Sequence, residues 1–453
     1  MTVVDLNQFS AQIARLEKSN GVLSAQSHRL SPRHAHQHPV HVLYGGAHLF
    51  SEATFAKIAR MSQEAFQFAA PDAGTLNKLV GGDWSTEFSS AIFSRVSKKM
   101  IREPLEDYRV DFEDGYGVRT DDEEDRHAKA AAVTMVKLAE AEHTPRVMGI
   151  RIKPLSTAGM RRSLRTLSLF VTQFAEESAV ASAVESAANS GRQTSASGSK
   201  RSRLKFMMVT LPKVTSPEQV TTLVDILDAF EKNFHLGAGF FRVEILIESP
   251  EAFLSVDGTI PLPSFVAAAR GRCQSLHFGI YDFTSSLGIG SAGQEIDHLS
   301  CDFARMWIQI VAGLAPGLGL SDGIINRLPM SPKENSSAAL ADYHDAWRYN
   351  YKQMMRSLTL GYYQGWDLHP SQLPIRHIAN HVFILQEFDS AAARLKVFVE
   401  RASQASLSGG LFDDRASVLG LLNFFERATA SGVLSRSEVE ARGVDIEAVK
   451  NSI

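Results

Sequence analysis

The stretch FRVEILIESP, residues 241–250, decides the fold. Five of its first seven positions are apolar, and the last three, Ile245 to Ile247, are consecutive, which is typical of a strand covered on both faces. A carboxylate, Glu248, stands where this apolar run stops. Strands buried on both faces belong to parallel sheets whose faces are covered by helices. The stretch therefore predicts an α/β fold with charged groups at the carboxyl ends of its strands.

Seven other apolar runs resemble this one, and longer amphipathic segments lie between them. The eight predicted strands are 39–44, 107–112, 147–153, 206–212, 241–247, 275–280, 319–326 and 364–368. Segments with apolar residues three or four positions apart predict helices at 51–68, 121–142, 217–230 and 302–312. A count of eight alternating units favours a closed TIM (β/α)8 barrel over an open sheet.

The barrel pattern does not cover the whole chain. Residues 1–38 predict a helix and a polar connector, and residues 39–375 predict the barrel. Within the barrel, residues 177–203 are rich in Ala, Ser and Gly and predict a disordered insertion. Residues 376–453 carry only helical patterns and predict a C-terminal helical extension.

Composition excludes several classes of function. The net charge of −3 provides no broad attraction for nucleic acid or for an anionic membrane. No apolar run approaches the roughly 18 residues that a transmembrane helix needs, and the N-terminus lacks a signal-peptide core. The only cysteines, Cys273 and Cys301, cannot form a disulfide framework. We expect a cytoplasmic protein with a small-molecule partner.

The ends of neighbouring strands predict a metal site. TIM barrels place their catalytic groups at the carboxyl ends of the strands. Glu248 and Asp282 follow the fifth and sixth strands, so their carboxylates are expected to face each other and to bind Mg²⁺, with Mn²⁺ as the alternative ion. Arg151, in the third strand, offers a planar fork for a substrate carboxylate. Each charge alone would equally suit a salt bridge at the barrel rim.

Further candidates lie at other strand ends. Glu113 and Asp114 follow the second strand, and crowded carboxylates raise one another's pKa, so either is a candidate for proton transfer. His48 is a candidate general base after the first strand, although a histidine bonded to a backbone carbonyl is the simpler interpretation. Two substrate contacts are predicted from the fourth and eighth strands and two from backbone N–H groups after the first, namely Lys213, His369, Gly45 and Gly46.

Six short motifs occur in the order of a known family. They are Asp111-Phe112-Glu113-Asp114, Arg151-Ile152-Lys153, Leu211-Pro212-Lys213-Val214, Ile247-Glu248-Ser249, Phe278-Gly279-Ile280-Tyr281-Asp282-Phe283 and His369-Pro370-Ser371-Gln372. In this order the chain resembles the citrate lyase beta-subunit and malyl-CoA lyase group of the HpcH/HpaI aldolase superfamily. The resemblance covers nearly the whole predicted barrel.

The resemblance implies a TIM barrel of the pyruvate/phosphoenolpyruvate-binding type. It also implies that Glu248 and Asp282 are metal ligands, and that the chain is a carbon–carbon lyase acting on a small hydroxy-acid acyl-CoA through a metal-stabilised enolate. Related lyases are trimers or hexamers, so a homotrimer or homohexamer is expected. The apolar positions of the last helices, such as Leu395 and Phe425, are expected to contact a second subunit.

The chain departs from the family pattern at two places near the predicted site. Tyr44-Gly45-Gly46-Ala47-His48 stands where the family has Pro-Gly and a nearby Arg, so the basic contact to coenzyme A is missing there. Lys153 replaces the usual Asn two positions after the arginine. Two alternatives therefore stay open, a class II aldolase acting on a free 4-hydroxy-2-oxo acid and a metabolite-binding barrel without catalysis.

Overall fold

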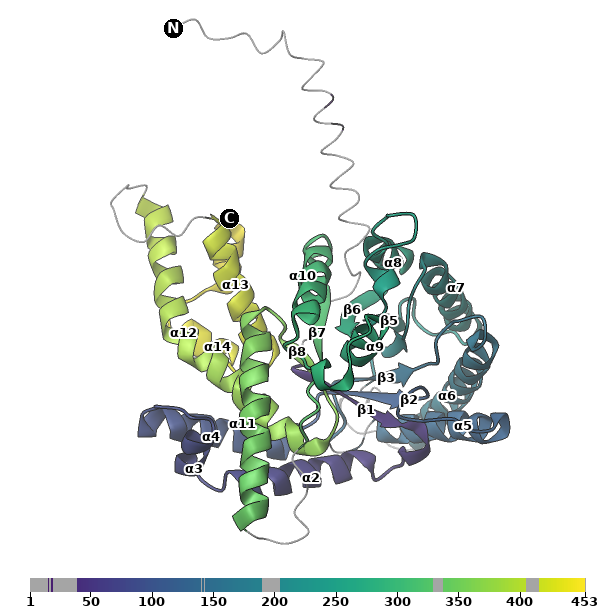
Figure 1. Cartoon of the computed structure of the whole chain (residues 1–453), viewed down its shortest axis with the longest axis horizontal. Coiled ribbons are helices and arrows are strands. Elements are labelled where there is room, and N and C mark those ends of the chain that lie inside the picture. Colours follow the sequence, from purple (N-terminus) through teal and green to yellow (C-terminus); the bar gives the residue numbers. More distant parts are fainter. Residues whose placement is uncertain are drawn as a thin grey trace, which may run out of the picture.

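The computed structural model describes residues 39–139, 141, 143–189, 204–328, 337–404 and 415–452, together with Arg15 and Lys18. Its centre is a closed barrel in which parallel strands pair in chain order and β8 pairs with β1 (Figure 1). The strands are β1 (His41–Gly46), β2 (Asp107–Asp111), β3 (Val147–Arg151), β4 (Met207–Leu211), β5 (Phe241–Ile247), β6 (Cys273–Phe278), β7 (Gly319–Ile324) and β8 (Gln364–Asp367). The predicted TIM barrel is confirmed.

Helices surround this barrel and continue beyond it. Those of the barrel region are α2 (Thr54–Ala69), α3 (Ala73–Leu79), α4 (Thr86–Arg102), α5 (Asp121–Leu138), α6 (Met160–Asn189), α7 (Pro217–Asn233), α8 (Leu262–Ala268), α9 (Ile280–Ser286), α10 (Leu299–Gly313) and α11 (Ser337–Thr359). The C-terminal helices are α12 (Leu373–Gln404), α13 (Arg415–Ala430), α14 (Arg436–Ala441) and α15 (Ile446–Ser452).

One predicted segment differs from the structure in its first part. Helix α6 continues to Asn189, so residues 177–189 are helical rather than the start of a disordered insertion. The Ala-rich composition of this part favours a helix once it extends one that is already formed. Residues 190–203 lie outside the described residues, as does the predicted N-terminal segment 1–38 apart from Arg15 and Lys18, which are helical.

The side chains of β5 that point into the barrel show its layers. Glu244 lies at the amino end, in a charged layer where its carboxylate contacts Arg109 at 2.6 Å. Leu246 is next and belongs to an apolar layer with Val42 and Trp366. Glu248 follows at the carboxyl end, because alternate residues of a strand share one face. An apolar layer therefore separates the structural charges from those of the predicted site.

The C-terminal helices form a core of their own. In Figure 1 helices α12, α13 and α14 stand together on one side of the barrel. The first half of α12 packs into the barrel core, and its second half joins α13 and α14 in a separate apolar cluster. Leu395 and Phe425 are buried in this cluster. The chain itself therefore covers these two positions, which were expected to contact a second subunit, whereas Val397 and Leu419 of the same helices stay 42% and 47% exposed.

None of the described helices combines the length and the apolar character that crossing a bilayer requires.

Acid should destabilise the protein through buried histidines near the amino ends of the strands. Burial lowers the pKa of His41 from 6.5 to about 4, and its Nε2 accepts a hydrogen bond from the Glu106 N–H at 3.0 Å. The unfolded chain binds this proton more tightly than the folded chain does. The contribution of neutral His41 to stability is therefore fully present above pH 6.5 and is lost as the pH falls through 4. We expect His41 to account for about 3 kcal/mol of this loss.

Urea unfolding at several pH values measures this effect. His41→Gln keeps a side-chain acceptor but cannot titrate, so it should lose less stability between pH 7 and pH 4 than the parent protein. The exposed His235→Gln is the matched control and should behave as the parent protein does. Equal pH dependence of the parent and His41→Gln would contradict the prediction.

Candidate active site

Five consecutive strands bring charged side chains together at the carboxyl end of the barrel. β2 is followed by Glu113, β4 by Lys213, β5 by Glu248 and β6 by Asp282, and β3 ends in Arg151. Of these, Arg151, Glu113 and Glu248 are buried. The structure thus gathers the predicted metal ligands, the predicted arginine and one predicted acid–base group in one site.

Lys213 lies at the centre of this site. Its Nζ contacts the carboxylate of Glu113, lies 3.1 Å from Asp282 Oδ2 and lies 3.6 Å from Asp114 Oδ1. Its backbone has a φ of 52°, a region that L residues rarely adopt. Burial lowers the pKa of this ammonium, but Glu248 and Glu113 outweigh burial and raise it overall. Lys213 is therefore the positive charge that balances the carboxylates.

Glu248 is a buried carboxylate with a strongly raised pKa. Its side chain is buried, and burial raises its pKa from 4.5 to about 8. Its Oε1 accepts a hydrogen bond from the backbone N–H of Lys213 at 2.7 Å. A Cβ atom at Gly279 would lie 2.5 Å from its Oε2, so glycine is required there for the carboxylate to occupy this place.

Arg151 has a different environment from the one predicted. Its Nε and Nη2 donate to the two oxygens of Asp111 at 2.7 and 2.6 Å, so Asp111 occupies the fork that was predicted to hold a substrate. Its Nη1 lies 2.9 Å from Glu113 Oε2 and 3.5 Å from Asp114 Oδ2. Only the Nη1 side faces the rest of the site, and a substrate carboxylate would have to bind there.

Asp111 organises the loop after β2. Besides holding Arg151, its oxygens accept hydrogen bonds from the backbone N–H groups of Glu113 at 2.9 Å and Gly115 at 2.7 Å. Sequence reasoning favoured Glu113 and Asp114 over this residue. The signal that was available is its position: Asp111 is the last residue of the strand and shares a face with Glu113. Asp111 is a positioning residue, because it fixes two groups of the site.

The glycines after β1 allow close packing. A Cβ at Gly45 would lie 2.0 Å from the hydroxyl of Tyr108, and one at Gly46 would lie 2.3 Å from the carbonyl oxygen of Gly115. Gly46 therefore lets the loop that Asp111 organises approach β1. Binding of an anionic substrate oxygen by these two glycines stays a prediction.

The two predicted histidines lie in separate surroundings. His48 lies in η2 (Ala47–Leu49), and its ring contacts that of Tyr116 edge to face. Burial, with Arg119 beside it, lowers its pKa. His369 caps η5 (Pro370–Gln372), where its Nδ1 accepts a hydrogen bond from the Ser371 N–H at 3.2 Å. Neither histidine has a recorded contact with Lys213, and their roles as base and substrate ligand stay predictions.

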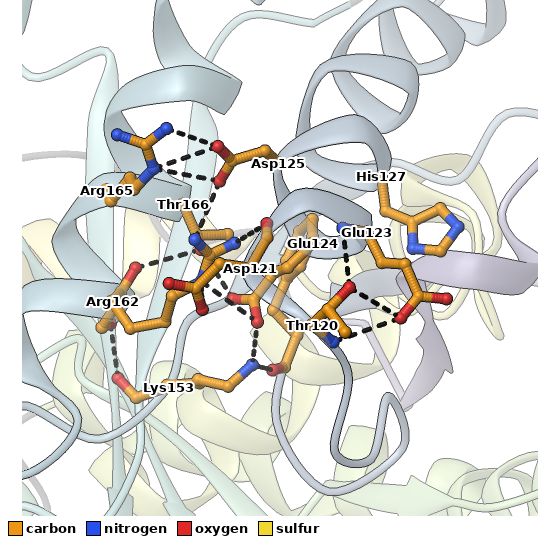
Figure 2. Close-up of polar contacts among 12 residues, drawn as sticks. Thr120, Asp121, Glu123, Glu124, Asp125, His127, Lys153, Arg162, Arg165 and Thr166 are labelled. Carbon is orange, nitrogen blue, oxygen red and sulfur yellow. Dashed lines mark hydrogen bonds and ion pairs between the residues drawn. The ribbon is translucent and has the colours of Figure 1, made fainter.

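Lys153 lies outside the candidate site and links the barrel to its helices. Figure 2 shows its ammonium beside Glu124 of α5, at 2.7 Å, and it also donates to the carbonyl oxygen of Phe112. Glu124 is buried and accepts a further hydrogen bond from Thr166 of α6. Thr120 caps the same helix. Lys153, which departs from the family pattern, therefore has a structural role, because it links the loop after β2 to α5.

Comparison with protein families identifies the relatives of the chain. A model described as a domain of unknown function, DUF6986, matches residues 24–183 and 201–452. The chain belongs to the DUF6986 family. A comparison with curated proteins gives no match.

Several solved structures are similar to this DUF6986 member. A citrate lyase from Burkholderia xenovorans LB400 is 17% identical, with a TM-score of 0.53, over 91% of this chain and 97% of the other. The protein CitE from Mycobacterium tuberculosis, in complex with magnesium, acetoacetate and coenzyme A, is 14% identical, with a TM-score of 0.45 and coverage of 87% and 99%. Malate synthase from Haloferax volcanii is 12% identical, with a TM-score of 0.43 and coverage of 92% and 99%. The first of these, the citrate lyase from Burkholderia xenovorans, shares the barrel fold of this chain.

The carboxylates of this DUF6986 member suit a hard divalent cation. Glu248 and Asp282 provide oxygen ligands from adjacent strands, which Mg²⁺ prefers. Burial raises the pKa of Glu248, and the positive charge of Lys213 offsets this rise only in part. The described residues contain no group of three or more Asp, Glu, His or Cys side chains arranged around one point. A bound ion would therefore need water or substrate oxygens to complete its coordination.

Proposed function

We propose that this protein is a divalent-metal-dependent enzyme that cleaves or forms a carbon–carbon bond next to a carbonyl group. The observation that supports this most directly is the convergence of Glu113, Asp282 and Asp114 on Lys213, beside the buried Glu248. Here the acids outnumber the lysine, as they would at a site that accepts a further cation.

Glu248 and Asp282 would hold Mg²⁺ or Mn²⁺. When bound, such an ion supplies Lewis-acid stabilisation of negative charge on a substrate carbonyl oxygen. Lys213 would leave its contact with Asp282 when the ion binds, and its ammonium would stay near Glu113. The fold of the citrate lyase from Burkholderia xenovorans is consistent with this use of the barrel.

Glu113 is the group best placed to move a proton. Burial raises its pKa, and the neighbouring Asp114 raises it further, while Arg151 and Lys213 lower it. A carboxylate with a raised pKa exchanges protons more readily near neutral pH. Its Oε2 lies against Arg151 Nη1, so one guanidinium contacts both the acid–base group and the place where a substrate carboxylate would bind.

The substrate is then a small acid with an acidic C–H bond next to a carbonyl group. Both open alternatives, a thioester of coenzyme A and a free 2-oxo acid, meet this description. Their common step takes a proton from the α-carbon to Glu113 and leaves an enolate, and return of a solvent proton regenerates the substrate.

Deuterium exchange distinguishes the alternatives without knowledge of the full reaction. The protein is incubated in D₂O with Mg²⁺ and either pyruvate or acetyl-CoA, and loss of the α-proton signal is followed by NMR. Exchange into pyruvate supports the free acid, and exchange into acetyl-CoA supports the thioester. If neither compound exchanges although one of them binds, the metabolite-binding barrel is the correct function and the proposal is wrong.

We also propose that the protein is a homotrimer or homohexamer that associates through α10. Large apolar side chains on one side of this helix are between 48% and 80% exposed, namely Leu299, Phe303, Met306, Ile310 and, directly after the helix, Leu314. Their spacing of three or four residues places them in one stripe. Contiguous exposed apolar surface of this kind marks an interaction site.

Light scattering tests this assembly. The parent protein should have three or six times the chain mass of 49.7 kDa, and Phe303→Glu combined with Met306→Glu should reduce it to one chain. Leu419→Glu, at a 47% exposed position of α13, is the matched control and should leave the mass unchanged. A parent mass of one chain over a wide concentration range would exclude the oligomer.

A further inference from the structure

A cavity lies at the opposite end of the barrel from the candidate active site. Its volume is about 710 Å³, which is within the range of small-molecule sites. It is lined by α4, by the segment before β3, by α12 and by the turn between α13 and α14. Helix α4 ends just before β2 begins, and His143 precedes β3, so the cavity opens beside the amino ends of these strands.

One side of α4 gives this cavity a positive charge. Arg95, Lys98, Lys99 and Arg102 line it, and their spacing of three and four residues places them on one side of the helix. Like charges at this spacing repel one another in the absence of an anion. Acidic residues neutralise part of the set: Arg95 contacts Glu438, and Lys99 lies 2.5 Å from Glu106 and 2.6 Å from Glu103.

Lys98 and Arg102 differ from the other two. Both are exposed, and no carboxylate among the described residues forms an ion pair with either. They are four positions apart, so their charged ends can approach one anionic group from two directions. Two free cations facing a cavity favour a ligand that carries two negative charges.

The cavity also provides a neutral acceptor. The Nδ1–H of His381 donates to the carbonyl oxygen of His377 at 2.7 Å, which leaves Nε2 without its proton. Burial lowers the pKa of His381 to about 4, so the ring is neutral near pH 7. Nε2 can accept a hydrogen bond from a hydroxyl or N–H group of the same ligand.

We propose that this cavity binds a small phosphorylated molecule, with its phosphate on Lys98 and Arg102. A phosphate dianion matches the two unpaired charges, and its oxygens accept hydrogen bonds from both side chains. The ligand would contact the barrel through α4 and the C-terminal helices through the turn at Gly432 and Val433. Its binding would therefore stabilise the packing of these helices against the barrel. This proposal does not depend on the reaction at the other end of the barrel.

The test uses inorganic pyrophosphate as the probe, with EDTA present and the ionic strength held constant, and citrate for comparison. Calorimetry and thermal unfolding of the full chain measure binding. We expect pyrophosphate to bind and to raise Tm, and Lys98→Ala combined with Arg102→Ala to weaken binding at least about tenfold. Lys57→Ala combined with Lys78→Ala removes two exposed charges of α2 and α3 and should bind as the parent does.

Two results would overturn the proposal. Equal binding by the two double variants would show that Lys98 and Arg102 do not hold the phosphate. Citrate binding that is as tight as that of pyrophosphate and is weakened equally by Lys98→Ala combined with Arg102→Ala would show that the cavity does not select phosphate. Because all four substituted residues of the two variants are exposed, misfolding does not explain either result.

Discussion

Glu248→Gln should abolish Mg²⁺ binding and lower the turnover of the substrate by about 10²–10³-fold. The substitution keeps the size of the side chain and its acceptor for the Lys213 N–H, and it removes only the negative charge. With one charged ligand left, Asp282 would meet the ion alone, and Lys213 would compete for that single carboxylate at 3.1 Å. Isothermal titration with Mg²⁺ and the exchange reaction in D₂O measure the two effects.

A control for this variant lies three residues further along the chain. Glu251 is exposed, and Glu251→Gln removes the same charge near the same strand end. It should leave both metal affinity and exchange unchanged. Retention of Mg²⁺ binding by Glu248→Gln and by Asp282→Asn alike would show that the ion, if it binds, binds elsewhere.

Asp111→Ala should destabilise the protein by about 3–5 kcal/mol, the usual cost of leaving a buried charge without its partner. Arg151 would lose both hydrogen bonds of its fork, and it would keep only Glu113 at 2.9 Å and the exposed Asp114 at 3.5 Å. The loop after β2 would also lose the acceptor for the N–H groups of Glu113 and Gly115. Urea unfolding at neutral pH measures the change in the free energy of unfolding.

Two comparisons separate the buried charge from the loop. Asp114→Ala removes a 60% exposed carboxylate that is 3.5 Å from Arg151, and it should cost no more than about 1 kcal/mol. Asp111→Leu combined with Arg151→Met removes both buried charges and should recover part of the stability lost in Asp111→Ala. A loss of under about 1 kcal/mol in Asp111→Ala would contradict the view that Asp111 supports the site.

The fold was predictable because several strands are apolar on both faces and because eight strand-like runs alternate with helical patterns. The run at 241–247 coincides with β5, and the ends of other strands differ from the prediction by a few residues at most. The charged layer inside the barrel was not predictable, since Glu244 and Arg109 stand within apolar runs and nothing in the sequence shows that they meet. The helical part of 177–203 was missed because its composition is also that of a disordered segment.

The positions of the charged residues at the strand ends were predictable, but the pairing among these residues was not. Motif order placed Glu248, Asp282 and Arg151 at strand ends, and the structure brings them together. Position along a strand does not say which carboxylate an arginine will choose, so the pairing of Arg151 with Asp111 required the structure. The central place of Lys213 depends on its left-handed backbone, which turns the chain after β4 back towards Glu248.

The ammonium of Lys213 competes with any incoming ion for the surrounding carboxylates, and it stays in place because it belongs to the chain. It allows the barrel to fold before an ion arrives, because Glu113 and Asp282 already have a counter-charge. It also sets the minimum charge that an incoming ion needs in order to displace the ammonium. A monovalent ion such as Na⁺ offers the carboxylates no more charge than the ammonium that it must displace, whereas a divalent ion offers twice as much. At the proposed metal site, a side chain that does not itself bind metal would thus provide discrimination against the abundant monovalent ions.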